Sequence, residues 1–133
     1  MKIHFIHIGK TGGTSIIHAL QKCTGKNYEF ILHPQETLLA DIPKDEKFFF
    51  STRDPLTRFQ SAFYSRQRQG RPRYMVDWSE NEAKCYKWYS TPEKLALDLK
   101  SLVIWKRRRA KYAINSIMHI NSSFWNWFLN EQY

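Results

Sequence analysis

Long apolar runs are missing from this sequence. The uninterrupted apolar segments are only a few residues long, whereas a transmembrane helix needs about 20 such residues. The chain begins Met1-Lys2 and shows no small-residue cleavage site after a long apolar stretch. We therefore predict a cytoplasmic protein without a signal peptide and without a membrane span.

Cysteine and acidic residues are also scarce. Cys23 and Cys85 are the only two cysteines, and no second pair suggests a zinc site or a disulfide-dense secreted scaffold, so we expect two free thiols. The 12 acidic residues are outnumbered by 21 lysines and arginines, which gives a net charge of +9. Such a chain attracts anions, among them nucleotides, sulfated or phosphorylated sugars, nucleic acid and acidic membrane surfaces.

What is present is enough apolar material for a fold. Hydrophobic residues make up 42% and aromatic residues 16% of the 133 positions, so the chain can form one domain with one core. Short apolar runs alternate with helical spacing along the first half. This pattern predicts strands over residues 3–8, 28–32 and 48–50, and helices over 14–23 and from 56 toward Gly70.

The second half is less regular. Residues 70–90 read as a loop with at most one helical turn, and Thr91-Pro92-Glu93 predicts a helix start. We expect the buried face of that helix to comprise Leu95, Leu99, Leu102 and Val103. The order of strands and helices predicts an α/β domain with a parallel sheet, whose ligand sits at the carboxyl ends of the strands.

Polar residues follow each predicted strand. Lys10, His33 and Arg53 come just after the first, second and third apolar runs. Because the carboxyl ends of parallel strands share one edge of the sheet, this is the arrangement that a ligand site requires. His4 and His7 alternate with apolar residues inside the first run, and we interpret them as packing residues.

The first of these turns has the composition of an anion-binding loop. Gly9, Gly12 and Gly13 allow backbone N–H groups to close around an anion at a helix N-terminus, and Lys10 adds a positive charge. The loop departs from the NTPase pattern, because its lysine precedes the glycine pair instead of following it, so a nucleoside-triphosphate kinase is the less favoured interpretation. The alternative to an anion-binding loop is a tight turn that binds no ligand.

Two segments together resemble the sulfotransferases that use 3'-phosphoadenosine-5'-phosphosulfate (PAPS). Residues 7–15, His-Ile-Gly-Lys-Thr-Gly-Gly-Thr-Ser, resemble their 5'-phosphosulfate loop. Arg53-Asp54-Pro55, followed by Arg58 and by residues 61–64, resembles their 3'-phosphate segment. The likeness covers residues 3 to 70 clearly and fades by 105. It is closest to the branch that includes carbohydrate sulfotransferases and bacterial relatives, and it implies a P-loop-like parallel sheet flanked by helices.

The resemblance assigns roles to individual residues. It implies that Lys10 contacts the sulfuryl group and its bridging oxygen, that Arg53 and Ser61 hold the 3'-phosphate, and that no metal is needed. The 5'-phosphate would be wrapped by Thr11, Gly12, Gly13, Thr14 and Ser15. His33 lies where relatives carry a histidine base, and the weakly nucleophilic acceptor hydroxyl requires a group that titrates near neutral pH. Lys10 and His33 are thus the expected catalytic residues.

The function predicted from these residues is transfer of a sulfuryl group from PAPS to an acceptor hydroxyl, on a carbohydrate by resemblance. No nucleic-acid partner is expected, and the acceptor and the oligomeric state are left open. Two alternatives remain: a nucleoside-triphosphate-dependent kinase, and a non-catalytic basic module that binds nucleic acid or sulfated polymer. Members of the resembled family extend beyond the equivalent of Tyr133, so residues 1–133 are expected to be the N-terminal part of a longer domain, with nucleotide binding but weak transfer.

Overall fold

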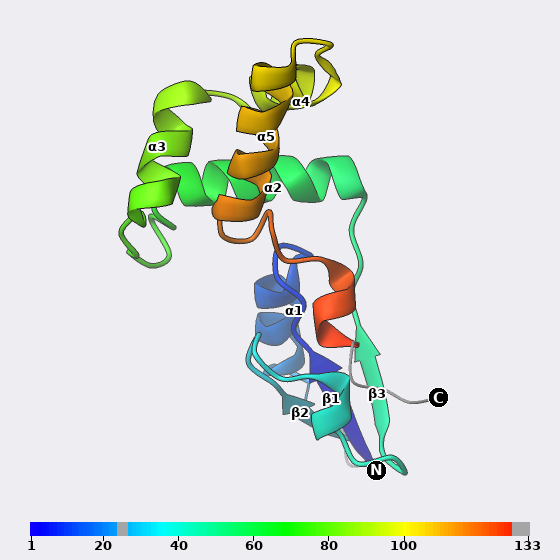
Figure 1. Ribbon diagram of the computed structural model, residues 1–133. Helices are drawn as coiled ribbons and strands as arrows, with labels where there is room; N and C mark the ends of the chain where they lie inside the picture. The colour runs from blue at the N-terminus through cyan, green and yellow to red at the C-terminus, as the bar shows by residue number, and fades with distance from the viewer. Residues whose placement is uncertain (24–26, 129–133) are drawn as a thin grey trace. The chain divides into compact units, whose positions relative to one another are not determined.

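The computed structural model describes residues 1–23 and 27–128, which form two compact units (Figure 1). The first unit comprises Met1–Arg53 together with the segment that begins at Ser123. The second comprises Asp54–Ser122. The first contains the sheet and the second contains four of the helices, so each is described by itself.

A three-stranded parallel sheet forms the first unit. Its strands β1 (Lys2–Ile6), β2 (Glu29–Leu32) and β3 (Lys47–Phe50) lie in the order β2-β1-β3. Phe5 of β1 is opposite Leu32 of β2 and Phe49 of β3. The α/β class with a parallel sheet and flanking helices is therefore confirmed. Strand β1 ends earlier than predicted, because the N–H of Ile8 turns back to donate to the carbonyl of Ile6.

The two faces of the sheet are covered by different elements, since successive side chains of a strand point to opposite faces. On one face, Phe5 contacts Phe49, and the ring of His7 reaches Gly13 at the start of α1 (Gly13–Leu20). On the other face, Ile6 belongs to an apolar cluster with Leu39 and Trp127. These two residues come from the short helices η1 (Leu39–Asp41) and η2 (Phe124–Trp127).

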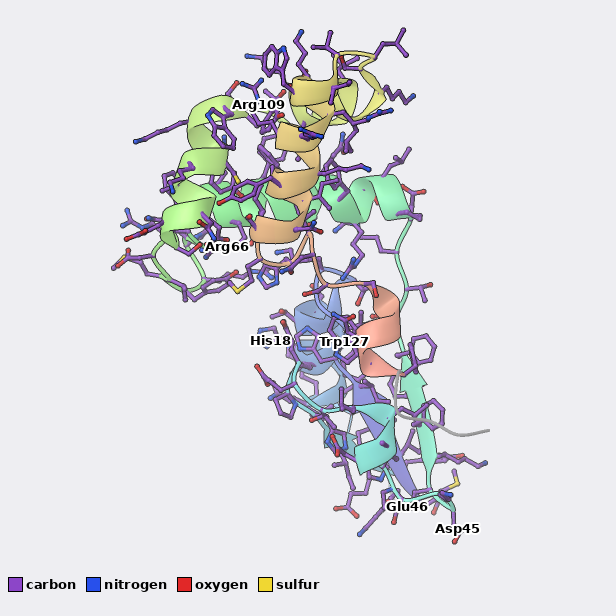
Figure 2. The ribbon with its side chains drawn as sticks, in the orientation of Figure 1. His18, Asp45, Glu46, Arg66, Arg109 and Trp127 are labelled. Carbon is purple, nitrogen blue, oxygen red and sulfur yellow. The ribbon has the colours of Figure 1, made fainter. Side chains whose placement is uncertain are left out.

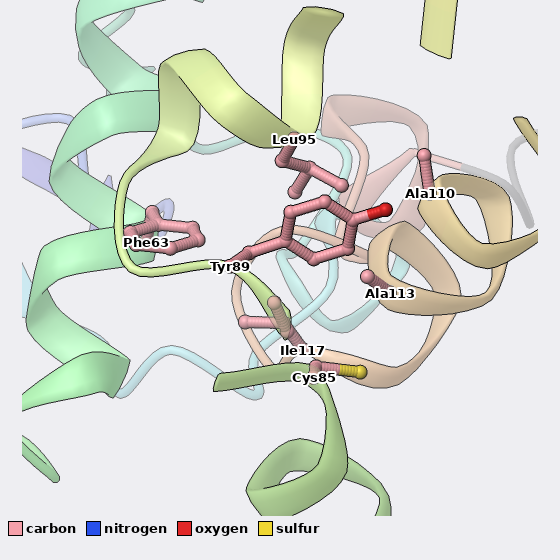
Figure 3. Close-up of a cluster of buried hydrophobic side chains, with 7 residues drawn as sticks. All are labelled: Phe63, Cys85, Tyr89, Leu95, Ala110, Ala113 and Ile117. Atoms are coloured by element: carbon pink, nitrogen blue, oxygen red, sulfur yellow. The ribbon is translucent and has the colours of Figure 1, made fainter. Parts of the chain in front are cut away.

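The second unit contains α2 (Pro55–Gln67), α3 (Glu80–Trp88), α4 (Pro92–Lys100) and α5 (Ile104–Ser116). Side chains from all four helices and from the residues that follow them build one core (Figure 3). Its fully buried members are Phe63, Cys85, Tyr89, Leu95, Ala110, Ala113 and Ile117. The predicted cap of α4 is confirmed, because the Thr91 hydroxyl accepts a hydrogen bond from the N–H of Lys94.

The expectations for residues 70–90 and for Leu102 and Val103 were wrong. Residues 70–90 contain a full helix, α3, which Ser79 and Glu82 cap reciprocally. Helix α4 ends at Lys100, so Leu102 lies beyond it with 94% of its surface exposed, and Val103 is exposed as well. Both cysteines are free, as predicted.

A buried ion pair links α2 to α3. Arg66 donates two hydrogen bonds to the carboxylate of Glu82, at 2.8 and 2.7 Å, and the side chains of both residues are almost fully buried (Figure 2 labels Arg66). Arg66 also donates to the carbonyls of Val76 and Asp77. These bonds order the segment before α3, in which the apolar residues Tyr74, Met75 and Val76 are exposed.

Candidate active site

The loop after β1 has an unusual backbone. Lys10 has φ 67° and Gly12 has φ 88°, so two of three consecutive residues are left-handed. A left-handed backbone is uncommon for a residue with a side chain, and it is found where the surrounding structure enforces it. The loop is therefore shaped by its surroundings rather than by local preference alone.

Gly13 is required at its position for a second reason. A β-carbon there would lie 2.1 Å from Cδ2 and 2.4 Å from Nε2 of His7. The missing side chain thus lets the first residue of α1 approach the end of β1 closely. His7, interpreted from the sequence as a packing residue, has this structural role, and burial lowers its pKa despite the nearby Glu36 carboxylate.

The N-terminus of α1 is suited to an anion. The first hydrogen bonds of the helix run from the N–H groups of Ser15 and Ile16 to the carbonyl of Gly12, and the N–H groups that precede them have no acceptor within the helix. Among the described residues, no side chain caps this end and no acid occupies its first turn. Thr14 is half-buried and Ser15 is exposed. The positive end of the helix dipole is therefore left for an external anion.

The loop after β1 contacts the residues that follow β3 within the first unit. The hydroxyl of Thr11 donates to the carbonyl of Ile8 at 2.8 Å and lies 2.9 Å from the hydroxyl of Ser51. Ser51 directly follows β3, so this bond joins the loop after β1 to the turn after β3. Arg53, two residues further along, is exposed. Ser61 lies on α2 in the second unit, and its assignment to the same phosphate rests on the resemblance alone.

His33 lies at the same edge of the sheet. Its N–H donates to the carbonyl of Phe5 at 3.2 Å, which extends the pairing of β2 with β1 by one residue. Burial, and after it the charge of His4, lower the pKa of His33, while the Asp41 carboxylate acts in the opposite direction. A histidine with a lowered pKa is neutral at pH 7, which is the form that accepts a proton.

The sequence did not reveal the partners of His33. Its Nε2 lies 2.7 Å from Nδ1 of His4, and Nε2 of His4 pairs with the carboxylate of Glu46. His4 is nearly fully buried, as expected of a packing residue. Yet it also carries two hydrogen bonds, and only the register of the three strands brings these residues together.

Two more residues border the loop that no sequence signal indicated. A β-carbon on Gly9 would lie 3.5 Å from the side-chain oxygen of Gln35 and 3.9 Å from the ring of Trp127. The indole N–H of Trp127 donates to the carbonyl of Gln35 at 2.7 Å. Trp127 is buried (Figure 2 labels it on η2). Gln35, after β2, and Trp127, on η2, thus both support the start of the loop.

No protein-family model, curated protein or solved structure compared with the chain matches it. Within residues 1–23 and 27–128, no three His, Cys, Asp or Glu side chains are grouped so that they could hold a metal ion. The described helices are also all too short or too polar to cross a membrane.

Proposed function

We propose that the chain is a sulfotransferase that moves a sulfuryl group from PAPS to an acceptor hydroxyl. The observation that carries this proposal is the hydrogen bond between Thr11 and Ser51. It joins, at one edge of a parallel sheet, the loop that resembles the 5'-phosphosulfate loop of that family to Ser51, two residues before Arg53, where the likeness to the 3'-phosphate segment begins. A tight turn without a ligand would not require a hydrogen bond from this loop to the residues that lead into Arg53.

The residues present fit a nucleotide donor that carries phosphate at both its 5' and its 3' positions. The N-terminus of α1 and Lys10 supply positive potential after β1, and Arg53 supplies a cation after β3. Within the described residues, the first turn of α1 carries no acidic side chain that would repel an anion. PAPS supplies the activated sulfuryl group and a phosphate leaving group.

The chain's own residues then have three tasks. His33, neutral at pH 7, takes the proton of the acceptor hydroxyl as its oxygen bonds to sulfur. Lys10 and the N-terminus of α1 neutralise the charge that grows on the 5'-phosphate as the bridging S–O bond breaks and its electron pair leaves with that phosphate. The acceptor is a carbohydrate on the strength of the resemblance.

Thermal protection of the whole chain separates this function from its alternatives. The nucleotide that remains after PAPS gives up its sulfuryl group is 3'-phosphoadenosine 5'-phosphate (PAP). We expect PAP to raise the melting temperature of the chain more than adenosine 5'-phosphate does at equal concentration. An oligonucleotide that protects where PAP fails would replace the proposal with a basic binding module. Protection by ATP that requires magnesium would replace it with a kinase.

A further inference from the structure

Three ionisable side chains form a continuous hydrogen-bonded row across the sheet. Glu46 precedes β3, His4 lies in the middle of β1, and His33 follows β2. His4 is opposite Ile31 and Phe48, so His33 and Glu46 are each two residues from its direct neighbours. Because side chains two residues apart on a strand share a face, all three groups lie on the same face of the sheet.

The contact between the two histidines is a hydrogen bond rather than a face-to-face stack. The ring planes are 13° apart and the ring centres are 5.0 Å apart, while Nδ1 of His4 and Nε2 of His33 are only 2.7 Å apart. Nitrogen atoms so much closer than the ring centres mean that the rings meet edge to edge. An in-plane N–H···N bond needs this geometry.

The direction of each bond follows from the number of protons. The ionised carboxylate of Glu46 can only accept, so Nε2 of His4 donates to it. A neutral His4 then has its lone pair on Nδ1, and Nε2 of His33 must donate to that atom. The lone pair of a neutral His33 is left on Nδ1.

We propose that His4 and Glu46 are positioning residues that hold His33 with Nδ1 as its proton-accepting atom and balance the charge that forms on its ring. This inference rests on the proposed sulfuryl transfer. As the acceptor oxygen bonds to sulfur, its proton goes to Nδ1 of His33, and the electron pair of the bridging S–O bond leaves with the 5'-phosphate. The imidazolium keeps its Nε2 proton in the bond to His4, and the Glu46 carboxylate supplies the counter-charge through His4.

The surroundings of His33 agree with this role. Burial and His4 lower the pKa of His33, and the charge of Asp41, from η1, opposes them. One oxygen of Asp41 accepts the N–H of Leu38, whereas the hydrogen bond made by the His33 ring runs to His4. Within the described residues, the row is not a metal site, since no three such groups converge on one point. The contacts that set the ring's orientation are therefore those to His4 and, through it, to Glu46.

Nitrogen NMR on the intact wild-type chain tests the geometry without any substitution. In a sample with ¹⁵N-labelled histidine, we expect a scalar coupling between Nε2 of His33 and Nδ1 of His4, with the proton on His33 while both rings are neutral. His33→Asn assigns the signals. Absence of this coupling in the wild-type chain, or a proton on Nδ1 of His33 in the neutral pair, would overturn the proposal.

A charge-matched pair of variants tests the role of Glu46. Glu46→Gln should lower the pH at which the histidine pair takes up its first proton by about one unit, since the protonated pair loses its counter-charge. Asp45→Asn removes the same charge from the neighbouring exposed residue (both are labelled in Figure 2) and should change that pH by about a tenth of this or less. Equal shifts in the two variants would remove Glu46 from the mechanism.

The transfer reaction adds a readout that a purely structural role would not move. The acidic limb of the pH profile of kcat/KM should shift to lower pH in Glu46→Gln, together with a loss of about tenfold or more at pH 7. If the acidic limb does not shift in Glu46→Gln, the proposed role of Glu46 is contradicted. Failure of the proposed function looks different: PAP would then bind no better than adenosine 5'-phosphate, while the coupling and the titration shift would persist.

Discussion

The ring of His7 packs against Gly13 so closely that a β-carbon at residue 13 would lie 2.1 Å from Cδ2 of His7. This contact brings the N-terminus of α1 against the end of β1 and thereby fixes the loop that carries Lys10. The loop geometry thus depends on a residue pair, and not on the glycines alone.

Replacing Gly13 by alanine should destabilise the fold by about 1–3 kcal/mol, because the ring of His7 must move out of its place. Gly12→Ala is the matched control: no atom lies within 4 Å of its β-carbon, so only its φ of 88° is penalised, at about 1–2 kcal/mol. Urea unfolding measures both. His7→Ala should make Gly13→Ala less costly, and an undiminished cost in the double variant would show that His7 is not the obstacle.

Stability should fall when the pH is lowered from 7.5 to 5.5. Burial lowers the pKa of both His33 and His7. The charge of His4 lowers the pKa of His33 further, whereas Asp41 acts against the shift of His33 and Glu36 acts against that of His7. The unfolded chain therefore binds more protons than the folded chain between the lowered values and the ordinary 6.5. The stability that the two neutral histidines contribute is fully present above pH 6.5 and is lost as the pH falls from 6.5 through their lowered pKa values. Urea midpoints of His33→Asn should depend on pH less steeply than those of the wild type, and an equal slope would refute the assignment.

The Arg66–Glu82 pair should be the most sensitive polar contact of the second unit. Glu82→Gln leaves a buried guanidinium without its counter-charge, which should cost about 3–5 kcal/mol. Glu80→Gln, an exposed change on the same helix, should cost about 0.5 kcal/mol or less. Chemical unfolding measures both, and similar losses in the two variants would show that the ion pair has no special weight.

The same pair predicts acid sensitivity. Burial alone would raise the pKa of Glu82, but the hydrogen bonds from Arg66 and from the N–H groups of Ser79 and Met118, with the charge of Arg66, lower it below its ordinary value of 4.5. The stabilisation is therefore present above pH 4.5 and is lost as the pH falls through the lowered value. Arg66→Met should flatten this dependence in unfolding curves measured between pH 6 and pH 3.

Lys10→Ala should impair turnover more than binding. The charge of Lys10 is most useful as the leaving phosphate develops its own, so transfer should fall about a hundredfold or more. The Kd for PAP should weaken by about tenfold or less. Lys22→Ala removes an exposed charge two residues beyond the C-terminal end of α1 and serves as the control. If the whole loss lay in nucleotide affinity, Lys10 would be only an anchor.

The sheet and its site edge could be predicted because their signals are local. The run from Ile3 to Ile8, the glycines after it and the proline after His33 each mark an element from a few adjacent residues. The helix over Glu80–Trp88 could not be predicted in this way. It is stabilised by the reciprocal cap of Ser79 and Glu82, by the ion pair with Arg66 and by burial of Cys85 against the other helices, and hence by contacts that short-range apolar periodicity does not record.

The row of Glu46, His4 and His33 was hidden for a similar reason. From the sequence, His4 is interpreted as a packing residue of an apolar strand, and no sequence pattern indicates a role for Glu46. Their proximity is set by the strand order β2-β1-β3 and by a register that aligns His4 with Ile31 and Phe48. Sequence spacing contains neither of these facts, although it correctly located His33 at the end of a strand.

The central claim is that the edge joined by Thr11 and Ser51 binds a nucleotide with phosphates at both its 3' and 5' positions. Calorimetry of PAP and of adenosine 5'-phosphate, on the wild type and on Arg53→Ala, tests it most directly. We predict that the wild type binds PAP about tenfold or more tightly than adenosine 5'-phosphate, that Arg53→Ala abolishes this preference, and that the exposed-arginine control Arg108→Ala keeps it. Equal affinity of the wild-type chain for the two nucleotides would contradict the account.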